Sequence, residues 1–310
     1  MIDEASRALF RDGAKILKGQ GILFADENFH TNEVFKGADL RFFTDRLDIA
    51  KQLEKLGLRG EISDFDLSVV GNNSQDFVLF RLSKMKLLTH HLLEEAARIL
   101  KPEGRLVLTG NNQEGIKSVI KSAEKIGELT VMELLGKGLR YANVIKKAGA
   151  ELHLKGEEYR EWIEIRSPEG ALFKTKPGIY GYKKIDEGSE FLVQTLKKEA
   201  LKGDLLDLGC GYGYLSLLLA QQPGVSRLIA TDNNIAAVEA CRKNLRFLSE
   251  SLPISVTLDD CGSEIQENSM DYIVCNPPFH QGFSTSKDLT RKFVRAVRRI
   301  LKRKGAAYLL

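Results

Sequence analysis

The second half of the chain alternates short apolar runs with longer amphipathic segments. The apolar runs lack the polar alternation of a half-exposed strand, and the segments between them carry hydrophobic residues at helical spacing. Strands of this kind lie in parallel sheets that helices cover on both faces, so the pattern predicts an α/β fold. We expect strands at 205–208, 227–231, 254–258, 272–275 and 306–310, and helices at 214–221, 236–249 and 287–302.

Three segments of the first half recur in the second half in the same order. One combines a helix end, a basic turn with glycine and an apolar strand. Another ends a strand in Thr-Asp before a helix, and a third places Asp before an apolar strand. One such match is compatible with chance, whereas three in register indicate duplication of one α/β unit. The pairs are 98–108 with 299–309, 43–50 with 230–236, and 76–80 with 271–275.

The segment between the two halves breaks this rhythm. It carries an apolar and polar alternation at 162–166, then the turn sequences Ser-Pro-Glu-Gly at 167–170 and Lys-Pro-Gly at 176–178. We therefore expect a hairpin or short strands there. The predicted organisation is an N-terminal domain at 1–150, a joining segment at 151–185 and a second domain at 186–310.

Composition excludes several classes of protein. The 310 residues are 43% hydrophobic, which argues against a disordered chain. No apolar run approaches the ~20 residues of a membrane helix, and the N-terminus shows no signal-peptide core. Cys210, Cys241, Cys261 and Cys275 form no CxxC pair and have no His at ligand spacing, so neither zinc nor disulfides are expected. We expect a cytoplasmic monomer without metal or membrane attachment.

Basic residues gather in the second half. Residues 1–170 carry 26 basic and 27 acidic side chains, whereas residues 171–310 carry 20 and 15, so the balance moves from −1 to +5. Residues 287–304 alone hold nine Lys or Arg and one Asp. This stretch suits contacts with nucleic-acid phosphates, although a solvated helix face explains it equally well.

A glycine-rich turn follows the first predicted strand of the second half. It reads Asp207-Leu-Gly209-Cys-Gly211-Tyr-Gly213 and opens a helix. Glycines permit positive φ and a close backbone approach to a ligand. The spacing differs from the G-x-G-x-x-G of dinucleotide folds, and the leading Asp would repel a pyrophosphate. An acid there suits a ligand with an amino group or a sulfonium; the alternative is a tight turn without a ligand.

Acidic residues end the next two strands. Asp232 lies 25 residues after Asp207, where a carboxylate can accept hydrogen bonds from both hydroxyls of a ribose. By itself, Asp232 is equally consistent with a helix N-cap. Asp259 and Asp260 end the third strand, where either side chain could reach the exocyclic amine of an adenine, or simply lie in a solvated turn.

The segment Asn276-Pro277-Pro278-Phe279-His280 directly follows the strand at 272–275. Two prolines remove two backbone donors and stiffen the chain. The Asn276 side-chain oxygen and the Pro277 carbonyl can then both accept from one amino group. Two acceptors draw its hydrogens out of plane and localise the nitrogen lone pair for attack on a methyl group. Phe279 offers a face on which a base stacks.

These motifs in this order resemble the class I methyltransferases that use S-adenosylmethionine. The longer form Asn-Pro-Pro-Phe-His-x-Gly at 276–282 is similar to that of the ribosomal RNA guanine-N2 methyltransferases, with the small-subunit enzymes nearest. The segments 177–180 and 186–189 also resemble that family's lead-in to the catalytic domain. The resemblance implies tandem duplicated Rossmann-like class I methyltransferase domains, of which the first has lost cofactor binding.

The resemblance also implies roles for individual residues. The methionine end of S-adenosylmethionine would lie on Asp207, Gly209 and Gly211, next to Gly213. The ribose would lie on Asp232 and the adenine near Asp260 or Asp259. Tyr180 and Gly188 would close over the cofactor. Asn276, Pro277 and Phe279 would bind the guanine, and His280 would line its pocket or cap a turn.

The first half departs from these motifs. In place of the glycine turn it has Ala25-Asp26-Glu27-Asn28-Phe29, and in place of Asn-Pro-Pro-Phe it has Arg81-Leu-Ser-Lys84-Met-Lys86. We expect neither site to work there. The first copy is then a scaffold, or it holds RNA through Arg81, Lys84 and Lys86. The second copy ends soon after Leu309, before the final helix and hairpin of a complete class I sheet, so we expect it to be truncated after its fifth strand.

The expected function is methylation of a guanine N2 in small-subunit (16S) ribosomal RNA, acting on the RNA or on the small ribosomal subunit. Large-subunit ribosomal RNA, adenine N6 and a protein glutamine amide are alternative targets, since all present a planar NH₂ group. A different class, the non-catalytic RNA-binding assembly factor, is disfavoured by the intact glycine turn and Asn276.

Overall fold

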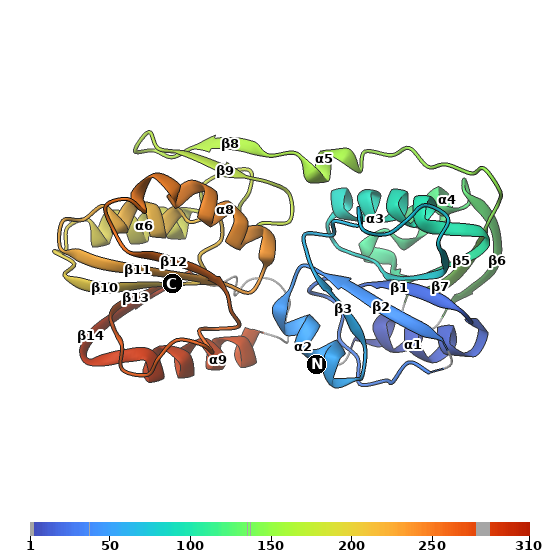
Figure 1. The fold of residues 1–310 in the computed structure, drawn as a ribbon, viewed down its shortest axis with the longest axis horizontal. Coiled ribbons are helices and arrows are strands. Elements are labelled where there is room, and N and C mark those ends of the chain that lie inside the picture. Colours follow the sequence, from blue (N-terminus) through green and yellow to red (C-terminus); the bar gives the residue numbers. More distant parts are fainter. Residues whose placement is uncertain (1–2, 37, 135, 137, 277–285) are drawn as a thin grey trace. The chain divides into compact units, whose positions relative to one another are not determined.

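The computed structural model describes residues 3–36, 38–134, 136, 138–276 and 286–310. It divides into two compact units, Met1–Arg160 (unit 1) and Glu161–Leu310 (unit 2), each with its own sheet and apolar core (Figure 1). Across the described ranges, no helix combines the length and apolar character needed to cross a membrane.

Unit 2 is built on a five-stranded parallel sheet with the order β12-β11-β10-β13-β14. The strands and helices predicted for this half are confirmed, with ends that move by a few residues and a last strand that begins earlier, at Leu301. The elements are α6 (Glu187–Leu196), β10 (Gly203–Leu208), α7 (Tyr214–Ala220), β11 (Val225–Asp232), α8 (Ile235–Leu245), η2 (Arg246–Leu248), β12 (Ile254–Leu258), β13 (Met270–Cys275), α9 (Ser286–Ile300) and β14 (Leu301–Leu309).

Two apolar clusters cover the two faces of this sheet. One gathers side chains from α6, α7 and α8, and the other packs Phe293, Val297 and Ile300 of α9 against β10 and β13 (Figure 1). The central strands are therefore buried on both sides, which explains their continuous apolar sequence. This burial fixes where each strand ends, and so it also fixes the positions of the residues that directly follow the strands.

A hairpin precedes the sheet of unit 2, as the turn sequences predicted. Strands β8 (Ile163–Arg166) and β9 (Leu172–Thr175) pair antiparallel, and Ser167 N–H donates to the Ala171 carbonyl at 2.8 Å. Gly170 adopts φ +88° in the connecting turn, which explains why glycine stands there. The boundary between the units falls at Arg160, inside the segment that the sequence predicts to join the halves.

Unit 1 has a seven-stranded sheet with the order β3-β2-β1-β4-β5-β7-β6. Its first five strands are parallel and repeat the order of the unit 2 sheet, while β7 runs antiparallel to β5. The elements are α1 (Glu4–Ile16), β1 (Gln20–Phe24), β2 (Asp39–Thr44), α2 (Leu47–Lys55), β3 (Arg59–Ile62), β4 (Gln75–Arg81), α3 (Lys86–Ile99), β5 (Leu100–Asn111), η1 (Asn112–Glu114), α4 (Ile116–Ala123), β6 (Gly127–Leu134), β7 (Leu139–Lys146) and α5 (Glu157–Arg160).

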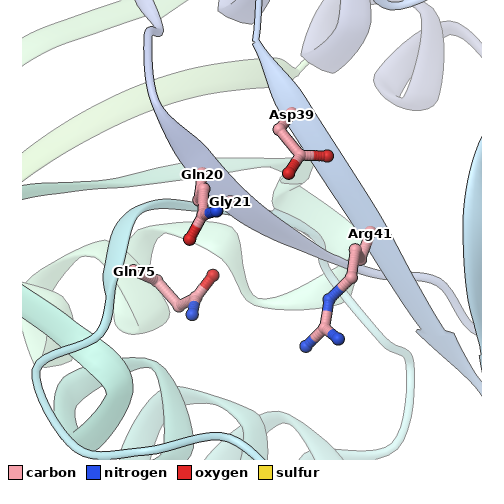
Figure 2. Close-up of a pocket in the computed structure, with 5 residues that line it drawn as sticks. All are labelled: Gln20, Gly21, Asp39, Arg41 and Gln75. Carbon is pink, nitrogen blue, oxygen red and sulfur yellow. The ribbon is translucent and has the colours of Figure 1, made fainter.

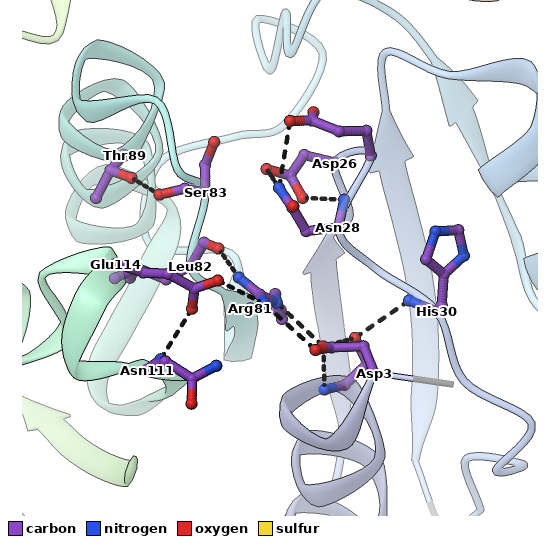
Figure 3. Close-up of polar contacts among 12 residues, drawn as sticks. Asp3, Asp26, Asn28, His30, Arg81, Leu82, Ser83, Thr89, Asn111 and Glu114 are labelled. Atoms are coloured by element: carbon purple, nitrogen blue, oxygen red, sulfur yellow. Dashed lines mark hydrogen bonds and ion pairs between the residues drawn. The ribbon is translucent and has the colours of Figure 1, made fainter. Parts of the chain in front are cut away.

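Arg81 ends β4 of unit 1 and is taken up by internal partners. Its guanidinium donates to Asp3 at 3.1 Å, to Glu114 at 2.8 Å and to the Leu82 carbonyl, and only 4% of the side chain is exposed (Figure 3). The hypothesis that Arg81 holds RNA is therefore wrong, because a buried and paired cation is inaccessible to a phosphate. Lys84 and Lys86, in contrast, are exposed.

The segment of unit 1 that replaces the glycine turn is also internal. Phe29 is fully buried, and the Asp26 carboxylate accepts the Asn28 N–H at 2.9 Å (Figure 3). Burial, together with the negative charge of Glu27, raises the pKa of Asp26 to about 7. A bulky ring and a buried acid thus stand where unit 2 has glycines.

We predict that Arg81→Ala destabilises unit 1 by about 3 kcal/mol, because it leaves the buried carboxylate of Glu114 without its cation. The exposed control Lys84→Ala should change stability by less than about 0.5 kcal/mol. Native-state hydrogen exchange of the β4 amides measures both. Equal protection in the two variants would show that Arg81 is exposed in solution.

Candidate active site at the carboxyl ends of the unit 2 strands

Three predicted site residues, Gly209, Asp232 and Asn276, closely follow positions that are paired across neighbouring strands of the parallel sheet. Asp207 of β10 pairs with Ala230 of β11 on one side and with Val274 of β13 on the other. In open α/β sheets, ligands bind beyond the carboxyl ends of the strands, where the strand order reverses. Gly209, Asp232 and Asn276 each lie two residues after one of these three paired positions.

The glycine turn is held against the end of β11. The N–H groups of Gly209 and Cys210 donate to the Thr231 carbonyl at 2.8 and 2.9 Å. Gly209, Gly211 and Gly213 have φ of +86°, +55° and +89°, values that residues other than glycine rarely adopt. A Cβ at Gly213 would lie 2.9 Å from the Cys241 sulfur, so this glycine lets α7 approach α8. A Cβ at Gly211 would meet nothing within 4 Å, so this part of the turn borders open space.

Asp232 lies beside that turn and is half-buried. Its Oδ2 accepts the Gly211 N–H at 2.9 Å, and its Oδ1 accepts the Asn234 N–H at 2.9 Å. The helix N-cap of α8 is Asn234, whose side chain accepts the Ala237 N–H. The N-cap interpretation of Asp232 is therefore wrong. Each carboxylate oxygen of Asp232 has a second lone pair that can accept from a ligand.

Asp207 lies beneath the glycine turn and is fully buried. Its Oδ2 accepts the Ser216 hydroxyl at 2.6 Å, while Oδ1 has no hydrogen-bond partner among the described residues. Burial raises the pKa of Asp207 to about 7, against an ordinary 3.8. An unpaired buried oxygen of this kind is uncommon and marks a functional-site candidate.

The two acids after β12 have different surroundings. Asp259 is buried, and its carboxylate accepts the Ser263 N–H at 2.8 Å and the Glu264 N–H at 3.2 Å, which closes a turn. The Asp260 carboxylate accepts from Lys292 of α9 at 2.5 Å, and 18% of its side chain is exposed. Of the pair, Asp260 is the one that a ligand can reach.

Asn276 is bound to residues of the lead-in segment. Its Nδ2 donates to Asp186 Oδ2 at 2.6 Å and to Ser189 Oγ at 2.7 Å. The Tyr180 hydroxyl donates to the other oxygen of Asp186 at 3.2 Å. A Cβ at Gly188 would lie at an ordinary contact distance, 3.5 Å, from Asn276 Nδ2, and its tight contact would be with Asp186 Oδ2 at 3.1 Å.

Sequence reasoning noted Asp186 and Ser189 only as part of the lead-in motif and gave them no role in the site. The available signal was the pattern Asp-x-x-Ser before an apolar helix, which predicts an N-cap. Asp186 does cap α6. Pro277, Phe279 and His280 lie outside the described residues.

Described residues of unit 1 line a cavity at each end of its sheet. One of about 380 Å³ lies at the start of β1, β2 and β4, the end of the sheet opposite to a ligand edge, and is lined by Gln20, Gly21, Asp39, Arg41 and Gln75 (Figure 2). The other, of about 290 Å³, lies past the carboxyl ends of β4 and β5, and Lys84, Lys86 and His90 are among its lining residues. Only the second occupies the edge that corresponds to the site in unit 2.

The Asp207 pKa gives a prediction about stability. In the folded protein this carboxyl keeps its proton up to about pH 7, whereas the unfolded chain loses it near the ordinary 3.8. Unfolding therefore releases a proton in this window, and stability falls as pH rises from about 4 to 7. We predict that the Tm advantage of Asp207→Asn over the wild type grows across that window and then levels off. An advantage that is constant with pH would contradict the buried, protonated carboxyl.

Family models match both halves of the chain. The model described as methyltransferase small domain N-terminal matches residues 6–133, and the model described as methyltransferase small domain matches residues 170–310. The matches fall within unit 1 and unit 2 respectively.

Relatives with the name ribosomal RNA small subunit methyltransferase C resemble the chain over most of its length. The protein of Shewanella piezotolerans is 29% identical over 76% of this chain and 67% of its own length. The protein of Pectobacterium atrosepticum is 27% identical over 94% of this chain and 81% of its own length. The protein of Shewanella denitrificans is 30% identical over 74% of this chain and 65% of its own length.

A solved structure has the same fold. The T. thermophilus 16S rRNA N2 guanine methyltransferase, determined with AdoMet and guanosine, superposes with a TM-score of 0.80 at 23% identity and covers 99% of this chain and 83% of its own. The fold is therefore that of the class I methyltransferases. With both of its domains matched, the chain belongs to the family of S-adenosylmethionine-dependent methyltransferases that includes ribosomal RNA small subunit methyltransferase C.

Proposed function

We propose that the protein transfers a methyl group from S-adenosylmethionine to the exocyclic N2 amine of a guanine in 16S ribosomal RNA. One observation carries the proposal. The glycine turn, Asp232 and Asn276 stand level at one edge of the sheet, and the Asn276 amide is held there through its nitrogen. Relatives of this family bear the name of the small-subunit enzyme, which supports that substrate. We expect a cytoplasmic monomer that needs no metal.

The residues at this edge suit S-adenosylmethionine. Each oxygen of Asp232 already accepts one backbone N–H and has a lone pair left for a ribose hydroxyl. The open space at Gly211 accommodates a ligand against the backbone. Asp207 Oδ1 has no partner among the described residues, and a cationic ligand beside it would favour loss of the proton that this carboxyl otherwise keeps up to about pH 7. Asp260, next to Lys292, is the candidate contact for the adenine amine.

Tyr180 and Gly188 would border the same cofactor from the lead-in segment. Almost half of Tyr180 is exposed, and its hydroxyl is tied to Asp186. The Asn234 side chain donates to the Gly178 carbonyl at 3.4 Å, which links the lead-in segment to the start of α8. These contacts hold Tyr180 near the edge where Asp232 stands.

S-adenosylmethionine, when bound, supplies an electrophilic methyl group on its sulfonium. Asn276 would accept a hydrogen bond from the guanine N2 amine through its side-chain oxygen, and the Pro277 carbonyl is the proposed acceptor of the second. This arrangement would leave the nitrogen lone pair free to attack the methyl group. The N–C bond would form as the C–S bond breaks, with the electron pair kept by sulfur and the extra proton on N2 lost to solvent. Phe279 is the proposed stacking partner of the guanine, and His280 would line the pocket or cap the turn that follows.

Other planar NH₂ groups fit the same chemistry. Guanine N2 of large-subunit ribosomal RNA, adenine N6 and a protein glutamine amide are the competing targets, and the names of the relatives favour the small subunit. A non-catalytic assembly factor on this fold would not need an amide oriented at the end of β13. Titration with S-adenosylmethionine separates that class, because a factor of this kind shows no binding.

We further propose that the two units arose by duplication, since the first five strands of both sheets follow one order. We assign two roles to unit 1. Asp26 and Phe29 are buried at the edge that corresponds to the cofactor edge of unit 2, which supports a scaffold role. Lys84 and Lys86, exposed beside a cavity at the carboxyl edge, remain available for RNA phosphates.

We predict that Asn276→Ala lowers methyl transfer to 16S ribosomal RNA by at least about 10²-fold, because the amine loses an acceptor that it needs in the transition state. Binding of S-adenosylmethionine should persist. Radiolabel transfer and calorimetric titration measure the two quantities. Transfer that stays within a few fold of the wild type would refute the proposed role of Asn276.

We predict that Asp232→Ala weakens binding of S-adenosylmethionine by about 10²-fold or more, the value of two hydrogen bonds to a charged acceptor. The matched control is Asp204→Ala, which removes an acid from the opposite end of neighbouring β10, where it pairs with Arg227. Calorimetric titration should show unchanged affinity in the control. Equal losses in both variants would mean that the effect of Asp232 is general destabilisation.

We predict that the double variant Lys84→Ala/Lys86→Ala raises KM for RNA, leaves kcat unchanged and reduces the salt dependence of RNA binding by about two phosphate contacts. The control, Lys18→Ala/Lys55→Ala, removes the same charge near the amino-terminal edge of the unit 1 sheet. Filter binding at several salt concentrations measures the slope. Identical slopes for wild type and double variant would leave unit 1 as a scaffold only.

A further inference from the structure

The side-chain amide of Asn276 is fixed in one orientation by the residues that contact it. Both hydrogen bonds that the described residues make to this side chain use Nδ2, at 2.6 Å to Asp186 Oδ2 and 2.7 Å to Ser189 Oγ. The nitrogen and oxygen of an amide are nearly equal in size, so packing alone does not select between the two orientations. The selection must come from the chemistry of the partners.

Asp186 supplies that chemistry. An ionised carboxylate only accepts hydrogen bonds, so it must face the amide nitrogen and would repel the amide oxygen. Burial alone would raise the pKa of Asp186, but hydrogen bonds from the Ser189 backbone, Asn276, Tyr180 and the Ser189 hydroxyl outweigh it, and the pKa is lowered. The carboxylate is therefore ionised at neutral pH.

Asp186 is itself held in place from two sides. Its Oδ2 accepts the Ser189 N–H at 2.9 Å as the N-cap of α6, and its Oδ1 accepts the Tyr180 hydroxyl. Gly188 lies in this first turn beside Asp186, since a Cβ there would make a tight 3.1 Å contact with Asp186 Oδ2. The first turn of α6 is thus built around the end of β13.

We infer that Asp186, assisted by Ser189, is a positioning residue that turns the Asn276 carbonyl oxygen toward the amine to be methylated. This rests on the proposed function. In the reversed orientation Asn276 would present an NH₂ group to the substrate amine, donor against donor, and the substrate would lose an acceptor. The same carboxylate oxygen of Asp186 therefore caps α6 and orients the catalytic amide.

The first experiment separates this role from helix capping. Ser and Asn are both good N-caps, so a capping role alone predicts that Asp186→Ser and Asp186→Asn behave like the wild type. The Asn variant keeps an oxygen at the Oδ2 position, and the Ser side chain is one atom too short to reach Asn276. We expect kcat to fall by about 10- to 100-fold in Asp186→Ser and by only a few fold in Asp186→Asn.

The control and the binding measurement accompany these variants. Glu187→Gln removes the same charge from the same helical turn, at a side chain that is 90% exposed, and should leave kcat unchanged. The affinity of Asp186→Ser for S-adenosylmethionine should change by no more than about threefold, the value of one weak hydrogen bond. An unchanged kcat in a folded Asp186→Ser would overturn the inference.

The second experiment is a pH profile of Asn276→Asp. Two carboxyl groups then face each other and share one proton, which raises one of the two pKa values. Only the protonated pair can donate to Asp186 and still accept from the substrate. Transfer by this variant should therefore be present at low pH and disappear as pH rises through the raised pKa.

The double variant Asp186→Ser/Asn276→Asp lacks the facing carboxyl, so this pH dependence should vanish. A flat profile in the single variant would overturn the inference, because it would mean that Asp186 does not face residue 276. Failure of the proposed function itself is distinguishable: the wild-type protein would then bind no S-adenosylmethionine and transfer no methyl group, which overturns both.

Discussion

The parallel register of β10, β11 and β13 is the constraint on which the site depends. Apolar side chains that are buried on both faces of the sheet set this register, and none of them is proposed to contact the substrate or the cofactor. Because the three strands are level at Asp207, Ala230 and Val274, the chain leaves the sheet at the same height three times. A different group follows each strand: the glycine turn follows β10, the Asp232 carboxylate ends β11, and the Asn276 amide follows β13.

The two units have the same order of parallel strands but different residues at the carboxyl ends of those strands. Their parallel strands share one order, yet the carboxyl edge of unit 1 holds the ion pairs of Arg81 with Asp3 and Glu114. These groups satisfy one another internally, whereas Asp207 in unit 2 keeps one oxygen without a partner among the described residues. At the end of the fourth strand of each sheet, unit 1 thus has a buried ion-pair cluster, whereas unit 2 has the Asn276 amide held through its nitrogen.

Periodicity predicted the strands and helices of unit 2 because buried parallel strands have a continuous apolar sequence, and most boundaries were right to within a few residues. Side-chain partners were harder to predict, because they depend on residues distant in the chain. Arg81 resembled an RNA contact until Asp3 and Glu114, 78 and 33 residues away, proved to pair with it. Asp186 lies 90 residues from Asn276, and no local pattern reveals that contact.

The central claim is that the edge of unit 2 directs a methyl group onto a guanine amine of 16S ribosomal RNA. The most direct measurement incubates 16S ribosomal RNA and small subunits with the protein and S-adenosylmethionine labelled in its methyl group. Nuclease digestion and mass spectrometry then identify the labelled nucleoside. The account predicts N2-methylguanosine at a single position. Label on adenine N6, on protein or on no product would contradict it.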